Sequence, residues 1–140
     1  MRYVKLVVQW LFALFFVLAG VQHFRDEEFF LRIMPDYIPQ ELHRPAVLVS
    51  GACEIALGVL LLIPRTTRLA AWGIIALLIA VFPANIYAFQ HSEELFGISK
   101  AQHFIRLPLQ GVMIALAYWF TRPPRQASAV SPETEDASTV

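Results

Sequence analysis

Five polar side chains stand out because each lies inside or at the end of a long apolar run. They are His23, Glu54, Asn85, Arg106 and Gln110. An ionisable group within a membrane-spanning segment costs about 2.5–3.5 kcal/mol on insertion scales, so it normally faces a partner or a cavity. Glu54 can pair with a cation or bind and release a proton, whereas Arg106 and the two amides can donate hydrogen bonds to a ligand oxygen. These side chains therefore favour binding of a proton or of a polar head group.

The spacing of the remaining reactive side chains favours neither a metal site nor a catalytic group. The four histidines are spread along the chain without the close spacing of a metal motif. Cys53 is the only cysteine, which excludes a disulfide within the chain and a mechanism based on two thiols. We therefore assign no catalytic residue and no metal ligand, and we expect no enzymatic activity of the chain on its own.

Four apolar runs must position the five polar side chains. About 20 apolar residues span the hydrocarbon core of a bilayer, and 18 helical residues cover about 27 Å. Only helices and closed barrels satisfy their backbone groups in lipid, and these runs lack the alternation of barrel strands. The sequence predicts transmembrane helices over residues 4–22, 46–63, 69–89 and 104–121.

The composition agrees with a membrane protein. Hydrophobic residues make up 57% of the 140 residues and charged residues 16%, against about 25% charged residues in soluble domains. The net charge is zero and the basic residues are scattered, which argues against a nucleic-acid partner. We expect one all-α domain over residues 1–122, an integral four-helix bundle in the lipid bilayer, followed by a disordered polar tail over residues 123–140.

The segment between the first two apolar runs has a pattern of its own. Phe30, Ile33, Met34 and Tyr37 recur at helical spacing, and charged residues occupy the other faces. This pattern predicts a short amphipathic helix in the headgroup layer, ended by the prolines of this segment. The helix either caps the bundle or covers a site between the transmembrane helices.

Basic residues near the span ends predict the orientation. Arg65 and Arg68 lie in the turn between the second and third runs, and the positive-inside rule places this turn, with both termini, in the cytoplasm. All five polar side chains then lie in the outer half of the bundle, with Glu54 about 12 Å below the outer end of its helix. We expect Glu54 to pair with Arg106 or with the amides of Asn85 and Gln110.

Small residues predict where the helices touch. Gly51, Glu54 and Gly58 share one stripe of the second span, and small residues mark helix–helix contacts in membranes. A similar stripe in the third span consists of Ala76, Ala80, Ala84 and Ala88.

The polar residues also lie within five short motifs that together cover roughly residues 8–122. The motifs are Ala-Gly-x-x-His-Phe at 19–24, Met-Pro-Asp-Tyr-Ile-Pro at 34–39, Ser-Gly-Ala-Cys-Glu at 50–54, Phe-Pro-Ala-Asn-Ile at 82–86 and Arg-Leu-Pro-Leu-Gln at 106–110. This combination resembles the DoxX family. The resemblance implies a four-helix bundle in the cytoplasmic membrane of a bacterium or archaeon. It also implies a link to redox systems, because relatives include subunits of an archaeal thiosulfate:quinone oxidoreductase and proteins linked to oxidative stress.

Three interpretations of function remain open. In the first, the chain is a non-catalytic subunit or accessory of a membrane redox or oxidative-stress system, with a redox enzyme as partner and a quinone bound among the polar side chains. In the second, it binds or transports a proton or a small solute, with Glu54 as the titrating group. In the third, the polar cluster only holds the helices in register. The sequence also leaves a homo-oligomer open.

Overall fold

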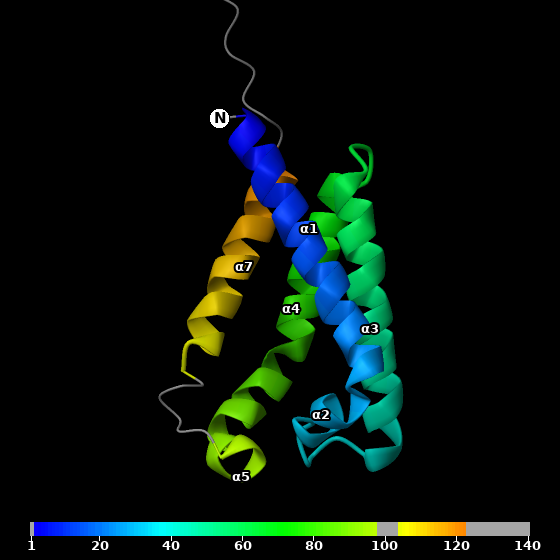
Figure 1. Ribbon diagram of the computed structural model, residues 1–140, viewed down its shortest axis with the longest axis vertical. Helices are drawn as coiled ribbons and strands as arrows, with labels where there is room; N and C mark the ends of the chain where they lie inside the picture. Colours follow the sequence, from blue (N-terminus) through cyan, green and yellow to red (C-terminus); the bar gives the residue numbers. More distant parts are fainter. Residues whose placement is uncertain (1, 98–103, 123–140) are drawn as a thin grey trace, which may run out of the picture.

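The fold is all-α, as the sequence predicts, in a computed structural model that describes residues 2–97 and 104–122 (Figure 1). The long helices follow the apolar runs because only helical hydrogen bonding satisfies the backbone of each run within itself. The predicted tail over residues 123–140 lies outside the described residues. The helices are α1 (Arg2–Arg25), α2 (Glu27–Arg32), α3 (Gln40–Leu62), α4 (Thr67–Gln90), α5 (Ser92–Phe96) and α7 (Arg106–Thr121).

Three of these helices, α1, α3 and α4, are long and apolar enough to cross a membrane. Each has 23 or 24 residues in its candidate span, which corresponds to about 35 Å. The helix α7 has 16 residues, or about 24 Å, which is less than the roughly 30 Å of a hydrocarbon core. The chain is therefore a small multi-pass helical membrane protein, and the predicted fourth crossing over residues 104–121 stays a prediction.

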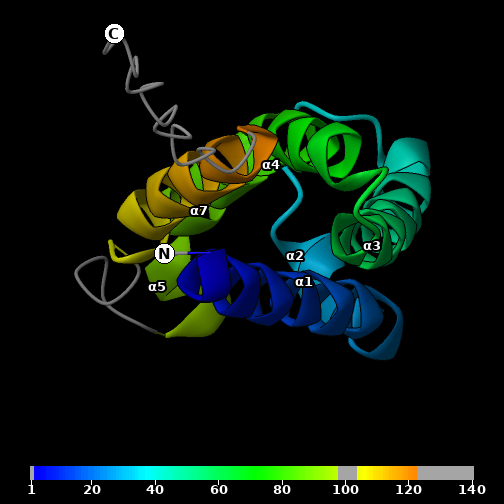
Figure 2. The same cartoon turned by 90° about the horizontal axis from the view of Figure 1, so that it is seen from above.

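The four longer helices surround the axis of the bundle (Figure 2). The helix α1 packs chiefly against α3, and α4 packs against both α3 and α7. One end of the bundle carries α2 and α5, and we call it the α2 end (Figure 1). The opposite end carries the start of α1, the turn between α3 and α4 and the end of α7, and we call it the Lys5 end.

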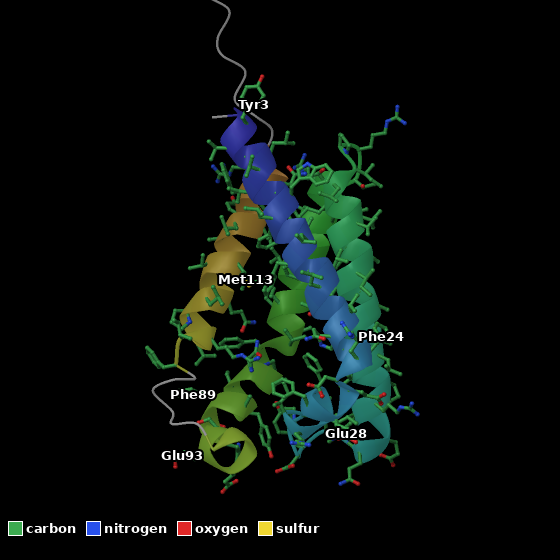
Figure 3. The ribbon with its side chains drawn as sticks, viewed as in Figure 1. Tyr3, Phe24, Glu28, Phe89, Glu93 and Met113 are labelled. Carbon is green, nitrogen blue, oxygen red and sulfur yellow. The ribbon has the colours of Figure 1, made fainter. Side chains whose placement is uncertain are left out.

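The side chains at the two ends and along the outer faces fit a membrane-spanning bundle. Figure 3 shows Glu28 and Glu93 at the α2 end and Tyr3 at the Lys5 end. Large apolar side chains such as Leu14 and Leu18 remain exposed on the outward face of α1. A surface helix of a water-soluble bundle would carry polar residues on such a face, whereas lipid solvates apolar ones.

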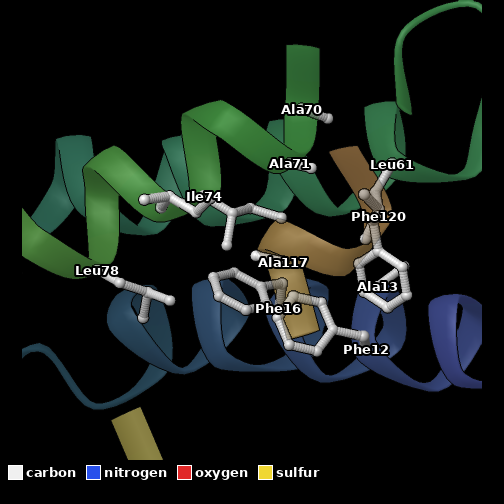
Figure 4. Packing of buried hydrophobic residues seen from close by; sticks show 11 residues of the cluster. Phe12, Ala13, Phe16, Leu61, Ala70, Ala71, Ile74, Leu78, Ala117 and Phe120 are labelled. Carbon is white, nitrogen blue, oxygen red and sulfur yellow. The ribbon is translucent and has the colours of Figure 1, made fainter. Parts of the chain in front are cut away.

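The apolar core lies toward the Lys5 end, since it includes residues near the end of α3, the start of α4 and the end of α7; Figure 4 shows how its side chains pack. Phe12 packs edge-on against Phe120 of α7, with ring centroids 5.4 Å apart, and Phe16 lies beside Phe12 at 5.0 Å. Ile74 of α4 and Leu61 of α3 are completely buried in the same cluster. The core therefore fixes the helices at the Lys5 end. Its members are Phe12, Ala13, Phe16, Leu61, Ala70, Ala71, Ile74, Ile75, Leu78, Ala117 and Phe120.

Two boundaries at the α2 end differ from the sequence prediction. The helix α3 begins at Gln40 rather than at residue 46, and it includes Pro45. Pro45 is the sixth residue of α3 and lacks the N–H that would bond the carbonyl oxygen of Glu41, but α3 continues through it. The short helix α2 stops at Arg32, so the apolar residues Ile33 and Met34 follow it in turns rather than on one helical face.

Candidate functional site

A cavity of about 510 Å³ occupies the α2 end of the bundle, beyond the apolar core. Its walls come from the second halves of α1 and α4 and the first halves of α3 and α7, and the segment after α1 covers it. Apolar side chains such as Met113, labelled on α7 in Figure 3, form most of the wall. All five of the side chains singled out by the sequence line this one cavity: His23, Glu54, Asn85, Arg106 and Gln110.

His23 and Glu54 form a close pair across the contact between α1 and α3. Nδ1 of His23 lies 3.2 Å from Oε2 of Glu54, and the two side chains are only 11% and 13% exposed. Nδ1 also lies 3.0 Å from the carbonyl oxygen of Ala19, to which it can donate. Oε2 of Glu54 is buried and receives no well-aligned hydrogen bond within the described residues. The carboxylate therefore keeps capacity to accept another hydrogen bond or a proton.

Two glycines make this pairing possible because they allow the helix backbones to approach. A Cβ atom on Gly20 of α1 would lie 2.6 Å from the carbonyl oxygen of Gly51 of α3. A Cβ atom on Gly51 would lie 2.6 Å from Cβ of His23. Side chains at these positions would force α1 and α3 apart, and His23 would lose its distance to Glu54. The structure thus confirms that the stripe of Gly51, Glu54 and Gly58 contacts another helix. Gly51 and Gly58 are both buried.

The two amides form a second pair between α4 and α7. Nδ2 of Asn85 donates to Oε1 of Gln110 at 2.9 Å, and Nε2 of Gln110 donates to the carbonyl oxygen of Leu78 at 2.5 Å. The two bonds reach α4 at Leu78 and Asn85, on either side of Pro83 within the helix, and α4 bends along its length (Figure 1). Proline lacks the N–H that would continue the helix and kinks it. Gln110 thereby ties α7 to the bent part of α4.

Arg106 differs from the other four side chains because its guanidinium has no hydrogen bond or ion pair within the described part of the chain. Its Nη1 atom is buried without a hydrogen-bond partner. The Cζ atom lies 6.0 Å from the ring centroid of Phe29, which is at the outer limit of a cation–π contact. Burying a cationic donor without an acceptor is costly. Arg106 is therefore the cavity side chain best able to bind an oxygen atom of a ligand.

The segment between α1 and α3, which covers the cavity, is held by contacts to three helices. The ring of Phe30 stacks on His23 with centroids 3.7 Å apart, which ties α2 to α1. The hydroxyl of Tyr87 donates to Oδ2 of Asp36 at 2.8 Å, which ties the turn after α2 to α4. Nε of Arg44 donates to Oε1 of Glu27 at 2.6 Å, which ties α2 to α3.

The prediction that Glu54 pairs with Arg106 or with the amides of Asn85 and Gln110 is wrong. Among the described residues, Glu54 has no ion pair or hydrogen bond with Arg106, Asn85 or Gln110, and its close partner is His23. Depth along a helix predicted correctly that the groups share one level, but it does not fix the rotation of each helix about its own axis. Across the described residues, no three histidine, cysteine or acidic side chains lie close enough together to hold a metal ion.

One of the two roles left open for the amphipathic segment agrees with the structure, because Phe30, Ile33, Met34 and Tyr37 line the cavity. The sequence reasoning missed Ser50. This residue also lines the cavity, and its position four residues before Glu54 on the same helix face was the signal that could have identified it.

These observations define the chain as a small helical membrane protein with a partly polar cavity at one end of its bundle. Residues 12–121 match a family described as a domain of unknown function, DUF8561, and the chain belongs to that family. No curated protein and no solved structure matches it. The resemblance to the DoxX family consequently rests on the sequence motifs alone and stays a hypothesis.

Proposed function

We propose that this protein is a non-catalytic subunit or accessory of a membrane redox or oxidative-stress system, and that its cavity binds a small amphipathic ligand such as a quinone. One observation carries the ligand half of the proposal: five polar side chains from four helices line a single, mostly apolar cavity. Ligand sites typically measure about 300–1,000 Å³ and combine apolar walls with a few polar groups that orient the ligand. The cavity, at about 510 Å³, falls in this range.

The free hydrogen-bonding capacity of the cavity favours a head group with acceptor oxygens. Within residues 2–97 and 104–122, Nη1 of Arg106 is a buried donor without an acceptor, whereas Nε2 of Gln110 already donates to Leu78. The carbonyl oxygens of an oxidised quinone accept hydrogen bonds, and its ring and isoprenoid chain suit apolar walls. A carbonyl placed on Arg106 would compensate the burial of this side chain.

The redox half of the proposal rests on the resemblance to the DoxX family. No side chain in the cavity carries electrons by itself, so electron transfer would require a partner enzyme that holds the redox cofactor. A membrane subunit of this kind would position the quinone for that partner. Copurification followed by mass spectrometry tests the assignment, because a redox enzyme among the bound proteins supports it and a set without one contradicts it.

The ligand half is tested by measuring the quinone that copurifies with the protein in mild detergent, per mole of folded protein. Arg106→Met removes the donors but keeps an apolar stem, and Gln110→Leu removes the bond to Leu78. The matched control is Gln9→Leu, because Gln9 also donates to a neighbouring helix, at 2.6 Å to the carbonyl of Leu61, but does not line the cavity.

We expect wild-type protein and Gln9→Leu to retain quinone equally. Arg106→Met should retain at least about tenfold less, which corresponds to about 1.4 kcal/mol of binding free energy. Gln110→Leu should retain more quinone than Arg106→Met, because the Gln110 amide is already bonded to Asn85 and Leu78. Folded wild-type protein without any bound quinone contradicts the choice of ligand. Equal retention in all four proteins contradicts the choice of site.

A cellular test separates the ligand interpretation from a purely structural one. Asn85→Leu and Gln110→Leu each leave the other amide without its partner, which costs about 1–3 kcal/mol, so the variants are compared at equal levels of folded protein in the membrane. If the cavity binds a functional ligand, neither variant should rescue a deletion strain under oxidative stress. Full rescue by both would show that the amides only hold α4 and α7 in register.

The pair of His23 and Glu54 favours a second candidate function, a proton-binding or small-solute-binding module. The two side chains lie 3.2 Å apart, and Oε2 of Glu54 has no well-aligned donor within the described residues. Such a pair can exchange a proton with a solute in the cavity. Protein in liposomes with an internal pH dye tests this function: Glu54→Gln should abolish any solute-dependent proton flux, and a wild type without such flux contradicts it.

A further inference from the structure

A second cavity, of about 490 Å³, lies at the Lys5 end of the bundle. It is bounded by the start of α1, the turn between α3 and α4 and the end of α7. The apolar core separates this cavity from the one at the α2 end, and the two share no lining residue.

Three cationic side chains line the second cavity: Lys5, Arg68 and Arg122. No carboxylate from the described residues lines it. Arg68 has no hydrogen bond or ion pair within residues 2–97 and 104–122, and the guanidinium of Arg122 bonds only the neutral hydroxyl of Tyr118, at 2.9 Å. Among the described residues, therefore, no acidic group compensates the positive charge of the cavity.

Lys5 also connects the start of α1 to the end of α7 through hydrogen bonds. Its Nζ donates to the carbonyl oxygens of Trp119 at 3.1 Å and of Arg122 at 2.6 Å, so it caps the last turn of α7. The bonds fix the backbone of Arg122 beside the start of α1. The two arginines remain available for a ligand.

The walls beside these cations are apolar. Leu6, Leu62 and Phe120 line the cavity together with the basic side chains. The cavity lies where the candidate membrane helices α1, α3 and α4 begin or end, which is the level of lipid head groups in a bilayer. Basic pockets between transmembrane helices at this level suit a phosphate next to acyl chains.

We propose that the Lys5 end binds one anionic phospholipid, with its phosphate between Arg68 and Arg122 and its acyl chains against Leu6 and Leu62. The lipid would link α1, the turn between α3 and α4 and the end of α7. This site is separate from the cavity at the α2 end, and its occupancy does not depend on a quinone there.

The test is native mass spectrometry of the full-length protein in neutral detergent, titrated with phosphatidylglycerol or phosphatidylcholine. Arg68→Gln and Arg122→Gln each remove one cation from the cavity, and neither touches the bonds of Lys5. Arg65→Gln is the matched control, because Arg65 lies in the turn that leads into α4, three residues before Arg68, is exposed as Arg68 is, and does not line the cavity.

Wild-type protein should bind one phosphatidylglycerol more tightly than phosphatidylcholine. Each cavity variant should weaken phosphatidylglycerol binding about fivefold, and Arg68→Lys should restore most of it. Arg65→Gln should leave the binding constant unchanged. An equal loss in Arg65→Gln, or no preference between the two lipids, would overturn the site.

A competition experiment with inorganic phosphate and glycerophosphoglycerol distinguishes a lipid from a soluble phosphate ligand. Neither should compete with phosphatidylglycerol at a hundredfold excess if the acyl chains contribute to binding. Effective competition by inorganic phosphate would assign the cavity to a soluble anion and overturn the lipid proposal.

Discussion

Gly51→Ala is the substitution for which the structure gives the clearest expectation. The added Cβ would lie 2.6 Å from Cβ of His23 and 3.0 Å from the carbonyl oxygen of Gly20. Carbon atoms in good contact lie about 3.5–4.0 Å apart. The helices α1 and α3 must therefore separate by about 1 Å, because backbone atoms and a Cβ cannot turn aside. Nδ1 of His23 and Oε2 of Glu54, which are 3.2 Å apart, would then move beyond hydrogen-bonding distance.

The expected cost follows from two opposing effects. Overpacking a tight contact destabilises by about 1–3 kcal/mol, whereas replacing glycine by alanine inside a helix stabilises by about 1 kcal/mol. Gly111→Ala in α7 isolates the second effect, because nothing lies within 4 Å of the Cβ it would add. The two variants should consequently differ by about 1–3 kcal/mol in the free energy of unfolding.

Gly73→Ala provides an intermediate case. Its Cβ would lie 2.6 Å from Cδ2 of Leu57, which is the end of a flexible side chain and can move. Equilibrium unfolding in mixed detergent micelles should rank the variants in the order Gly111→Ala, Gly73→Ala, Gly51→Ala, from most to least stable. If Gly51→Ala is as stable as Gly111→Ala, the close contact of α1 and α3 is wrong, and with it the pairing of His23 and Glu54.

Three further predictions concern other parts of the molecule. Lys5→Met should lower the free energy of unfolding by about 1 kcal/mol in the same assay, because α7 loses the cation at its last turn; an unchanged value would contradict the capping role. Glu54→Ala should cost about 1–3 kcal/mol, because the contact to His23 at 3.2 Å is lost while Nδ1 of His23 keeps the carbonyl oxygen of Ala19, and Glu54→Gln should cost less; equal folded yields in a fluorescence-detected chromatography assay would argue against a buried pair. In intact cells, on a Cys53→Ala background, an impermeant thiol reagent should label Glu93→Cys and not Thr66→Cys, and the reverse pattern would invert the predicted orientation.

The helices could be predicted from the sequence because long apolar runs leave the backbone few alternatives in lipid. Their boundaries were predicted less well where a helix extends beyond its apolar run. The helix α3 begins at Gln40, six residues before the apolar run, and contains Pro45. The start of α7 at Arg106 shortens the fourth predicted span, because Phe104 and Ile105 form a turn before it.

The stripes of small residues illustrate what a sequence pattern can and cannot predict. The glycine stripe of α3 lies in a contact, since only a missing Cβ permits the observed backbone approach. The alanine stripe predicted for α4 is wrong as a buried seam: Ala76 and Ala80 are exposed, and only Ala88 is fully buried. Alanine is compatible with lipid as well as with a helix contact, so its spacing alone does not identify the buried face.

The polar groups of the α2 end do not all require the same explanation. His23 pairs with Glu54 and Asn85 with Gln110, so each of these groups has a partner inside the protein that could hold two helices in register. Arg106 has no such partner within the described residues, and its Nη1 atom is buried. A buried cationic donor without an acceptor is costly, and holding two helices in register does not offset that cost where no bond is formed. Arg106 is therefore the residue for which a purely structural role and a bound ligand predict different behaviour.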